Sequence, residues 1–187
     1  MIVTEKPSVA MSYAKVLGVH GRQDGYLEGS GYLISWCVGH LVELAPPSAY
    51  GEQYVKWNIA DLPILPEEWQ YLVSASTKKQ FAVLKKLLHR ADVETVVNSC
   101  DAGREGELIF RLVYEQAGCR KPVSRLWLSS MEDNAIREGF ANLKPQKNMM
   151  HCIRLHSAGN VPIGWSASTV PGFFPACMVG LWQSGVL

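Results

Sequence analysis

The sequence has no long apolar run, no strong excess of one charge and no Cys-x-x-Cys pair. A membrane-spanning helix needs about 20 apolar residues, and no stretch approaches that length, so we expect no membrane contact. The 18 basic and 17 acidic side chains leave a net charge of +1, which does not by itself indicate a nucleic-acid binder. The five cysteines lack zinc-site spacing and indicate reduced thiols. Because the first residues do not form a signal-peptide pattern, we expect a cytoplasmic protein.

Residues 1–147 carry a regular alternation of strand and helix signals. Apolar, β-branched stretches predict strands at 2–4, 95–99 and 123–128, and a hairpin that pairs 26–28 with 32–38. Apolar residues at helical spacing predict a helix that Pro7 opens and Gly18 ends, a basic helix over 78–90, a helix over 106–117, and one capped by Ser130 and Asp133. This alternation predicts an α/β fold with a parallel sheet flanked by helices.

The most informative segment is Cys100-Asp101-Ala102-Gly103-Arg104-Glu105-Gly106-Glu107, which joins a predicted buried strand to a predicted helix. It places three carboxylates and an arginine at the carboxyl edge of the sheet, where ligands bind in open α/β folds. Mg²⁺ prefers oxygen ligands such as Asp101 and Glu105, and Arg104 suits a phosphate oxygen. The alternative is a helix start whose acidic residues suit the helix dipole. That alternative explains one carboxylate, but not three with an arginine and two glycines.

Glu5 follows the first predicted strand directly and extends this acidic cluster. The carboxyl ends of two parallel strands can lie side by side, so we expect Glu5 to face Asp101. His40 follows a glycine at the end of another predicted strand. For His40 a structural role and a catalytic role both remain open.

The basic helix carries lysines at Lys78 and Lys79, in a Thr77–Gln80 pattern that predicts a capping box. Its apolar stripe consists of Phe81, Leu84, Leu87 and Leu88. A charged face of this kind is usually only solvated, although it also offers a surface for nucleic acid.

Four segments in order resemble the Toprim domain of type IA DNA topoisomerases, most closely the bacterial topoisomerase III branch. They are Thr4-Glu5-Lys6-Pro7-Ser8-Val9-Ala10, Trp36-Cys37-Val38-Gly39-His40-Leu41-Val42-Glu43-Leu44, Asp101 to Glu107, and Arg125-Leu126-Trp127-Leu128-Ser129-Ser130. The resemblance implies a Toprim-type sheet and a Mg²⁺-dependent enzyme that cuts and rejoins one DNA strand. It implies DNA, in single-stranded segments, as partner.

The resemblance also assigns roles to individual residues. Glu5 would be the general acid or a metal ligand, and Asp101 and Glu105 would complete the Mg²⁺ site. Lys6 and Arg104 would act on the DNA phosphate, with Lys78 and Lys79 as further DNA contacts. Gly103 departs from the usual Asp-x-Asp-x-Glu pattern, which leaves one carboxylate fewer and weakens any second metal site.

The nucleophilic tyrosine of the family lies in a later domain. None of the tyrosines here matches its motif; they are Tyr13, Tyr26, Tyr32, Tyr50, Tyr54, Tyr71 and Tyr114. We therefore expect this chain to be inactive alone, with the missing topoisomerase domains as possible partners in trans. Two alternatives stay open. One is another Toprim nuclease or primase, which would lack the second and fourth segments. The other is a non-enzymatic fragment that binds DNA or a partner.

Residues 148–187 contain a single charged side chain, Arg154, and no helical or strand period. Permitted codons for residues 148–151, read two bases later, give Tyr-Asp-Ala, and continuing in that frame gives a string that resembles the family's next segment. We therefore expect a Toprim domain at 1–147, followed by an irregular, poorly structured tail translated out of frame after a one-base deletion near Lys147. The alternative is a genuine divergent extension.

Overall fold

The computed structural model describes residues 1–56, 58–61 and 63–145. The predicted tail at 148–187 lies outside them. The chain divides into two compact units, which we describe separately. The first contains Met1–Glu43 and the described residues from 73 to 145, and the second contains Leu44–Leu72. Within the described residues, the four α-helices and the main sheet belong to the first unit.

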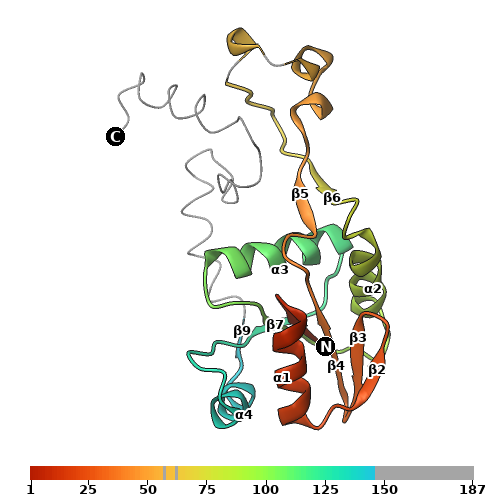
Figure 1. Ribbon diagram of the computed structural model, residues 1–187, viewed down its shortest axis with the longest axis vertical. Helices are drawn as coiled ribbons and strands as arrows, with labels where there is room; N and C mark the ends of the chain where they lie inside the picture. Colours follow the sequence, from red (N-terminus) through yellow and green to blue (C-terminus); the bar gives the residue numbers. More distant parts are fainter. Residues whose placement is uncertain (57, 62, 146–187) are drawn as a thin grey trace. The chain divides into compact units, whose positions relative to one another are not determined.

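The main sheet has seven strands in the order β2-β3-β4-β1-β7-β8-β9 (Figure 1). Their bounds are β1 Ile2–Thr4, β2 Gly21–Gln23, β3 Tyr26–Gly29, β4 Tyr32–Trp36, β7 Val96–Ser99, β8 Val123–Arg125 and β9 Lys144–Pro145. The central pairings, β4 with β1, β1 with β7 and β7 with β8, are parallel. The pairings of β2 with β3, β3 with β4 and β8 with β9 are antiparallel. The sheet is therefore mixed, with a parallel centre as the sequence predicts.

Two pairs of helices cover the two faces of the sheet. Both faces need cover because successive side chains on a strand point to opposite faces. The helices are α1 Pro7–Leu17, α2 Lys78–Leu88, α3 Arg104–Ala117 and α4 Asp133–Ala141. Helix α1 packs against α4, and α2 packs against α3. Figure 1 shows the two pairs on opposite sides of the sheet. The core on the α1 and α4 side includes the register partners Ile2, Ile34 and Val97.

Several helix ends follow the sequence closely. Pro7 occupies the first turn of α1, and Gly18 ends the helix in the left-handed conformation with φ 69°. A left-handed residue at this position favours glycine, which has no Cβ to clash with the backbone. Helix α2 buries the predicted stripe of Phe81, Leu84, Leu87 and Leu88.

The predicted capping box at the start of α2 is wrong. Thr77 makes no side-chain cap; its hydroxyl instead donates to the carbonyls of Leu41 and Ser74. The Gln80 amide donates to the carbonyls of Trp36 (2.8 Å) and Gly25 (3.1 Å). Gln80 thus ties α2 to the sheet: its amide donates to distant carbonyls, whereas a capping box would have it accept from the Thr77 backbone N–H.

Other boundaries also differ from the sequence-based expectation, including the ends of α2 at Leu88 and of β4 at Trp36, each two residues short. Helix α3 begins at Arg104, two residues before the predicted start, with Gly103 at its N-cap. Strand β8 ends at Arg125, three residues short of the predicted end. Helix α4 has Glu132 at its N-cap, and the Ser130 hydroxyl accepts a hydrogen bond from the Glu132 amide at 3.2 Å.

The second unit is built from short 3-10 helices, at Pro47–Ala49, Glu52–Val55 and Ile59–Asp61. Tyr50 organises one part of it: its ring packs edge-on against Trp69, and its hydroxyl bonds to the backbone of Gln70. Strands β5 Val42–Leu44 and β6 Tyr71–Val73 form a small sheet where the chain enters and leaves this unit.

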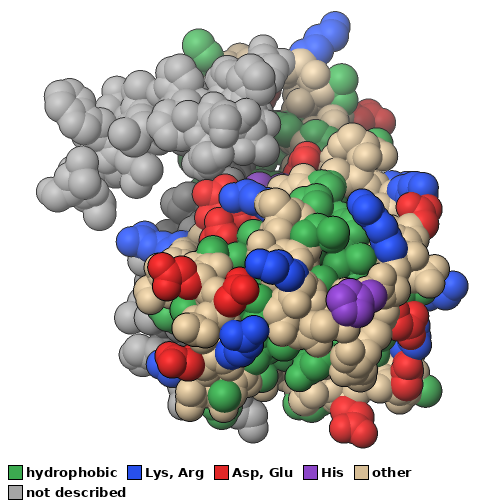
Figure 2. Space-filling view, turned by 60° about the horizontal axis from the view of Figure 1, so that its bottom comes forward, with side chains coloured by type: hydrophobic (Ala, Val, Ile, Leu, Met, Phe, Trp, Pro, Cys, Tyr) green, Lys and Arg blue, Asp and Glu red, His purple; other side chains and the backbone are tan. Residues whose placement is uncertain are grey.

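Charge is mixed over the visible surface. Figure 2 shows acidic and basic side chains interspersed on the face in view. This distribution agrees with the net charge of +1. No helix among the described residues is long and apolar enough to cross a membrane.

Candidate metal and phosphate site

The functional side chains converge because three parallel strands end together. Thr4, the last residue of β1, is in register with Trp36 at the end of β4 and with Ser99 at the end of β7. Whatever follows these strands must therefore lie along one edge. The residues that follow include Glu5, His40 and Asp101. We call these three residues, together with Lys6 and Glu105, the acidic edge.

Lys6 joins the first two carboxylates of this edge. Its Nζ lies 3.3 Å from Glu5 Oε1 and 3.3 Å from Asp101 Oδ2. The hydrogen bond to Asp101, followed by the charge of Glu5, raises the pKa of Lys6 above its usual value. The expected meeting of Glu5 with Asp101 thus takes the form of two carboxylates sharing one cation. Glu5 is the more buried of the two, with 13% of its side chain exposed against 56% for Asp101.

Glu105 has a different partner, His40. Their atoms Nε2 and Oε1 lie 3.2 Å apart, and both side chains reach solvent. Gly39 adopts a left-handed conformation with φ 82° just before the histidine. The structure therefore brings His40 to the acidic edge, which the sequence left undecided.

Within the described residues, no group of three or more histidine, cysteine, aspartate or glutamate side chains lies close enough to hold a metal ion. The donor chemistry nevertheless fits Mg²⁺, which is bound in proteins through one or two carboxylates together with water and phosphate oxygens. Glu5 and Asp101 supply two such carboxylates and already hold a cationic group between them.

The predicted phosphate-binding residues occupy two places. Arg104 is the first residue of α3 and is exposed next to the acidic edge in sequence. Lys78 and Lys79 are exposed on α2, where Lys79 pairs with Asp24 at 2.9 Å. In the part of the chain that the structure describes, neither lysine forms an ion pair with an acidic-edge carboxylate.

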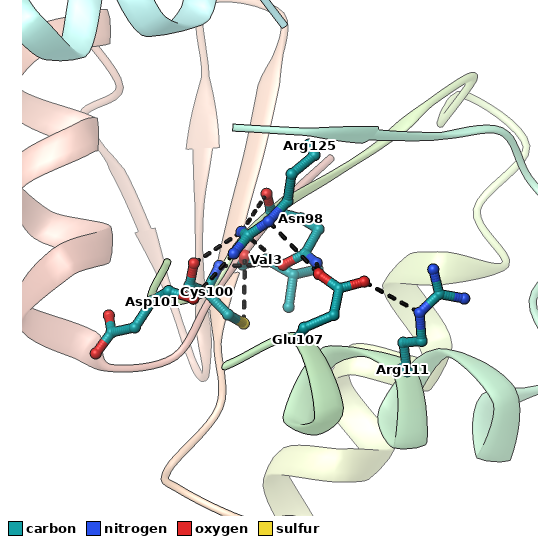
Figure 3. Close-up of polar contacts among 7 residues, drawn as sticks. All are labelled: Val3, Asn98, Cys100, Asp101, Glu107, Arg111 and Arg125. Atoms are coloured by element: carbon teal, nitrogen blue, oxygen red, sulfur yellow. Dashed lines mark hydrogen bonds and ion pairs between the residues drawn. The ribbon is translucent and has the colours of Figure 1, made fainter. Parts of the chain in front are cut away.

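Beneath the edge lies a buried polar layer, formed by Asn98, Glu107 and Arg125 and drawn in Figure 3. The register places Asn98 opposite Arg125, so both project from the same face of the sheet, toward Glu107 in α3. The sequence pattern counted Glu107 among three carboxylates at the sheet edge, but the structure buries it beneath that edge against Asn98 and Arg125. Arg125 stood out in the sequence only as part of a motif. The available signal was a charged residue within an otherwise strand-like run.

Gly106 lets this layer and the edge approach each other. A Cβ at Gly106 would lie 2.4 Å from the Asp101 carbonyl oxygen and 2.8 Å from the Asp101 nitrogen. Those distances are shorter than any ordinary contact and involve backbone atoms. The first turn of α3 therefore packs directly on the Asp101 backbone because residue 106 has no side chain.

This parallel-centred sheet with its acidic edge places the protein among the α/β proteins whose ligands bind at the carboxyl ends of the strands. The Toprim family model matches residues 1–131. The chain belongs to the Toprim family.

Its relatives point to one group within that family. The chain is 49% identical over 147 residues to DNA topoisomerase 3 of Bacillus thuringiensis, covering 79% of this chain and 20% of the relative. It is 43% identical over 171 residues to DNA topoisomerase 3 of Bacillus subtilis, covering 90% of this chain and 24% of the relative. The chain thus spans about a fifth to a quarter of the length of these relatives.

A solved structure supports the fold independently. Full-length topoisomerase I from Thermotoga maritima superposes with a TM-score of 0.53 at 23% identity, covering 82% of this chain and 22% of that one.

Proposed function

We propose that this chain is the Mg²⁺- and phosphate-binding part of a type IA DNA topoisomerase, and that it does not change DNA topology alone. The observation that carries the proposal is the position of Lys6 Nζ, at 3.3 Å from both Glu5 and Asp101. Two carboxylates that share a cation at a sheet edge offer a place for a divalent ion. The similarity to topoisomerase 3 supplies the substrate class, DNA.

In the proposed site Glu5 and Asp101 would hold the ion, and Glu105 would have to leave His40, its partner in this structure, to add a third carboxylate. When bound, Mg²⁺ neutralises charge on the reacting phosphodiester. The chain's own groups then have separate tasks. Lys6 and Arg104 would bind phosphate oxygens, and Glu5 would either hold the ion as a carboxylate or, when protonated, give a proton to the leaving 3′-oxygen, but not both at once.

Two of the tyrosines, Tyr13 and Tyr114, are unsuited to act as the nucleophile that the reaction needs. Tyr13 is in the core, and burial raises its pKa to about 12. Burial likewise raises the pKa of Tyr114 to about 12, and its hydroxyl donates to the Lys121 carbonyl. Neither phenol is set up to ionise near neutral pH. A nucleophile supplied by another domain agrees with the length of the topoisomerase 3 relatives.

For residues 148–187 we propose out-of-frame translation. The proposal rests on the change of composition after Lys147 and on the family-like string in the shifted frame. The nucleotide sequence of the gene tests it directly. A shifted reading near codon 147 should restore a topoisomerase-like continuation, and its absence would rule the idea out.

Relaxation of supercoiled plasmid with Mg²⁺ tests the proposed function. The comparison is between this chain and a version restored to the in-frame, full-length reading. We expect no relaxation by the short chain and relaxation by the restored one. Relaxation by the short chain would place a nucleophile within it, whereas an inactive restored chain would contradict the topoisomerase assignment.

A further inference from the structure

Arg125 is almost completely removed from solvent, with 1% of its surface exposed. Its guanidinium points under the acidic edge and donates to backbone carbonyls there (Figure 3). Nη1 donates to the Cys100 carbonyl at 2.7 Å and to the Asn98 carbonyl at 3.0 Å, and Nη2 donates to the Asp101 carbonyl at 2.9 Å. One side chain from β8 thus bonds to the end of β7, at Asn98, and to the loop that leaves it, at Cys100 and Asp101.

Glu107 is the counter-ion of this guanidinium, through an ion pair rather than a hydrogen bond to Nε. Its Oε2 lies 3.5 Å from Arg125 Nε and accepts a hydrogen bond from Asn98 Nδ2 at 2.8 Å. Its Oε1 accepts from Arg111 Nε at 3.0 Å. Burial lowers the pKa of Arg125, and the charge of Glu107 opposes that effect. An arginine stays charged even so, and its planar fork suits several fixed carbonyls better than a lysine does.

A buried ion pair is weak evidence for stability, because an apolar replacement is often as stable. This arrangement instead fixes the position of the loop backbone at Asp101. The Asp101 carbonyl accepts from Arg125 and also from the Gly103 amide at 2.8 Å. The backbone of Asp101 is therefore fixed from two sides, while its carboxylate remains exposed.

We propose that Arg125, oriented by Glu107, is a positioning residue that sets the direction of the Asp101 carboxylate. The inference rests on the proposed function, in which Asp101 binds Mg²⁺. Partners beyond the direct ligands commonly change metal affinity by 10- to 100-fold when they are mutated. Arg125 would act in this way through the backbone, without touching the ion.

The test compares Arg125→Lys with Arg111→Gln in the 187-residue chain. Arg111 also contacts the Glu107 carboxylate, from within α3, but among the described residues it makes no hydrogen bond to the loop. Amide hydrogen exchange reports on the loop through the Cys100 and Gly103 amides, which bond to Asn98 Oδ1 and the Asp101 carbonyl. Calorimetric titration with Mg²⁺ reports on the site.

For Arg125→Lys we expect both loop amides to exchange about tenfold faster, without a matching change in α2, and the Kd for Mg²⁺ to rise about tenfold. Arg111→Gln should leave both readouts within about twofold of the parent chain. Glu107→Gln, which keeps the shape of the side chain, serves if Arg125→Lys does not fold. It should speed loop exchange and raise the Kd for Mg²⁺ as well, by smaller factors.

Unchanged loop exchange and unchanged Mg²⁺ affinity in a folded Arg125→Lys variant would overturn the inference, even if the variant melted at a lower temperature. Equal effects from Arg111→Gln would do the same. A parent chain that binds no Mg²⁺ would contradict the proposed function instead. The exchange data would still decide whether Arg125 positions the loop.

Discussion

The exposed acidic edge and the buried polar layer beneath it contain the same kinds of groups in opposite settings. On the edge, Lys6 and Asp101 each have 56% of their side chains exposed, and their contacts are 3.3 Å long. In the layer, Arg125 is 1% exposed and has hydrogen bonds as short as 2.7 Å. Exposed pairs contribute little to stability and exchange partners easily, whereas removing one buried partner leaves an uncompensated charge.

This difference separates two tasks. The buried layer fixes the backbone from which the edge projects, and the edge keeps its carboxylates available. Substitutions in the layer should therefore act mainly on stability and loop position. Substitutions at the edge should act mainly on ion binding. The following four predictions test that division, beginning with the largest expected effect.

Glu107→Ala should destabilise the fold by about 3–5 kcal/mol, because it leaves the buried Arg125 without its counter-charge. Urea unfolding followed by circular dichroism measures the change. The matched control is Glu105→Ala in the same helical turn, where 70% of the side chain is exposed and stability should hardly change. Equal losses in the two variants would remove the distinction between layer and edge.

Gly106→Ala should destabilise the fold by about 1–3 kcal/mol, because its Cβ would meet the Asp101 backbone and overpack the contact. It should also weaken Mg²⁺ binding by displacing Asp101. Gly103→Ala is the control, since nothing lies within 4 Å of a Cβ there. Thermal unfolding and Mg²⁺ titration of both variants decide the matter; a fully stable Gly106→Ala variant would contradict the close packing.

Lys6→Met should leave stability nearly unchanged and tighten Mg²⁺ binding severalfold, because the ion no longer competes with an ammonium group between Glu5 and Asp101. Calorimetry at low salt measures the affinity. Lys79→Met, which removes an exposed pair with Asp24, should leave it unchanged. Weaker Mg²⁺ binding by Lys6→Met would show that Lys6 supports the site rather than occupying it.

Gly103→Asp should produce the smallest change in stability, a gain of a few tenths of a kcal/mol from a better N-cap for α3. It restores the second acidic position of the usual motif, so Mg²⁺ affinity or stoichiometry should rise. Titration of the variant against the parent chain measures both quantities. No change in either would mean that residue 103 does not face the ion.

Local features of the fold could be predicted from the sequence. Side chains that bond to residues far away in the chain, instead of to near neighbours, could not. Gly18 ends α1 as expected, because the left-handed requirement is local. Gln80 was misassigned, because its acceptors at Gly25 and Trp36 are 55 and 44 residues away. The antiparallel edge strand β9 depends on the distant pairing of Arg125 with Lys144 and gave no strong local signal.

The candidate site shows the same limit. Glu5 and Asp101 lie near each other because they follow two parallel strands that end together, which a sequence pattern can indicate. The contact between His40 and Glu105 needs a third strand, β4, to lie beside β1. The role of Arg125 depends on its register opposite Asn98 and on the path of α3 above them, neither of which the pattern specifies.

The central claim is that the acidic edge is a cation site, and Mg²⁺ titration of the parent chain and Asp101→Asn tests it most directly. The exposed Asp101 carboxylate makes the substitution mild for stability, which thermal unfolding can verify. We predict saturable Mg²⁺ binding by the parent chain and at least about tenfold weaker binding by Asp101→Asn. Equal binding by the two folded proteins would contradict the claim, as would the absence of binding by the parent chain.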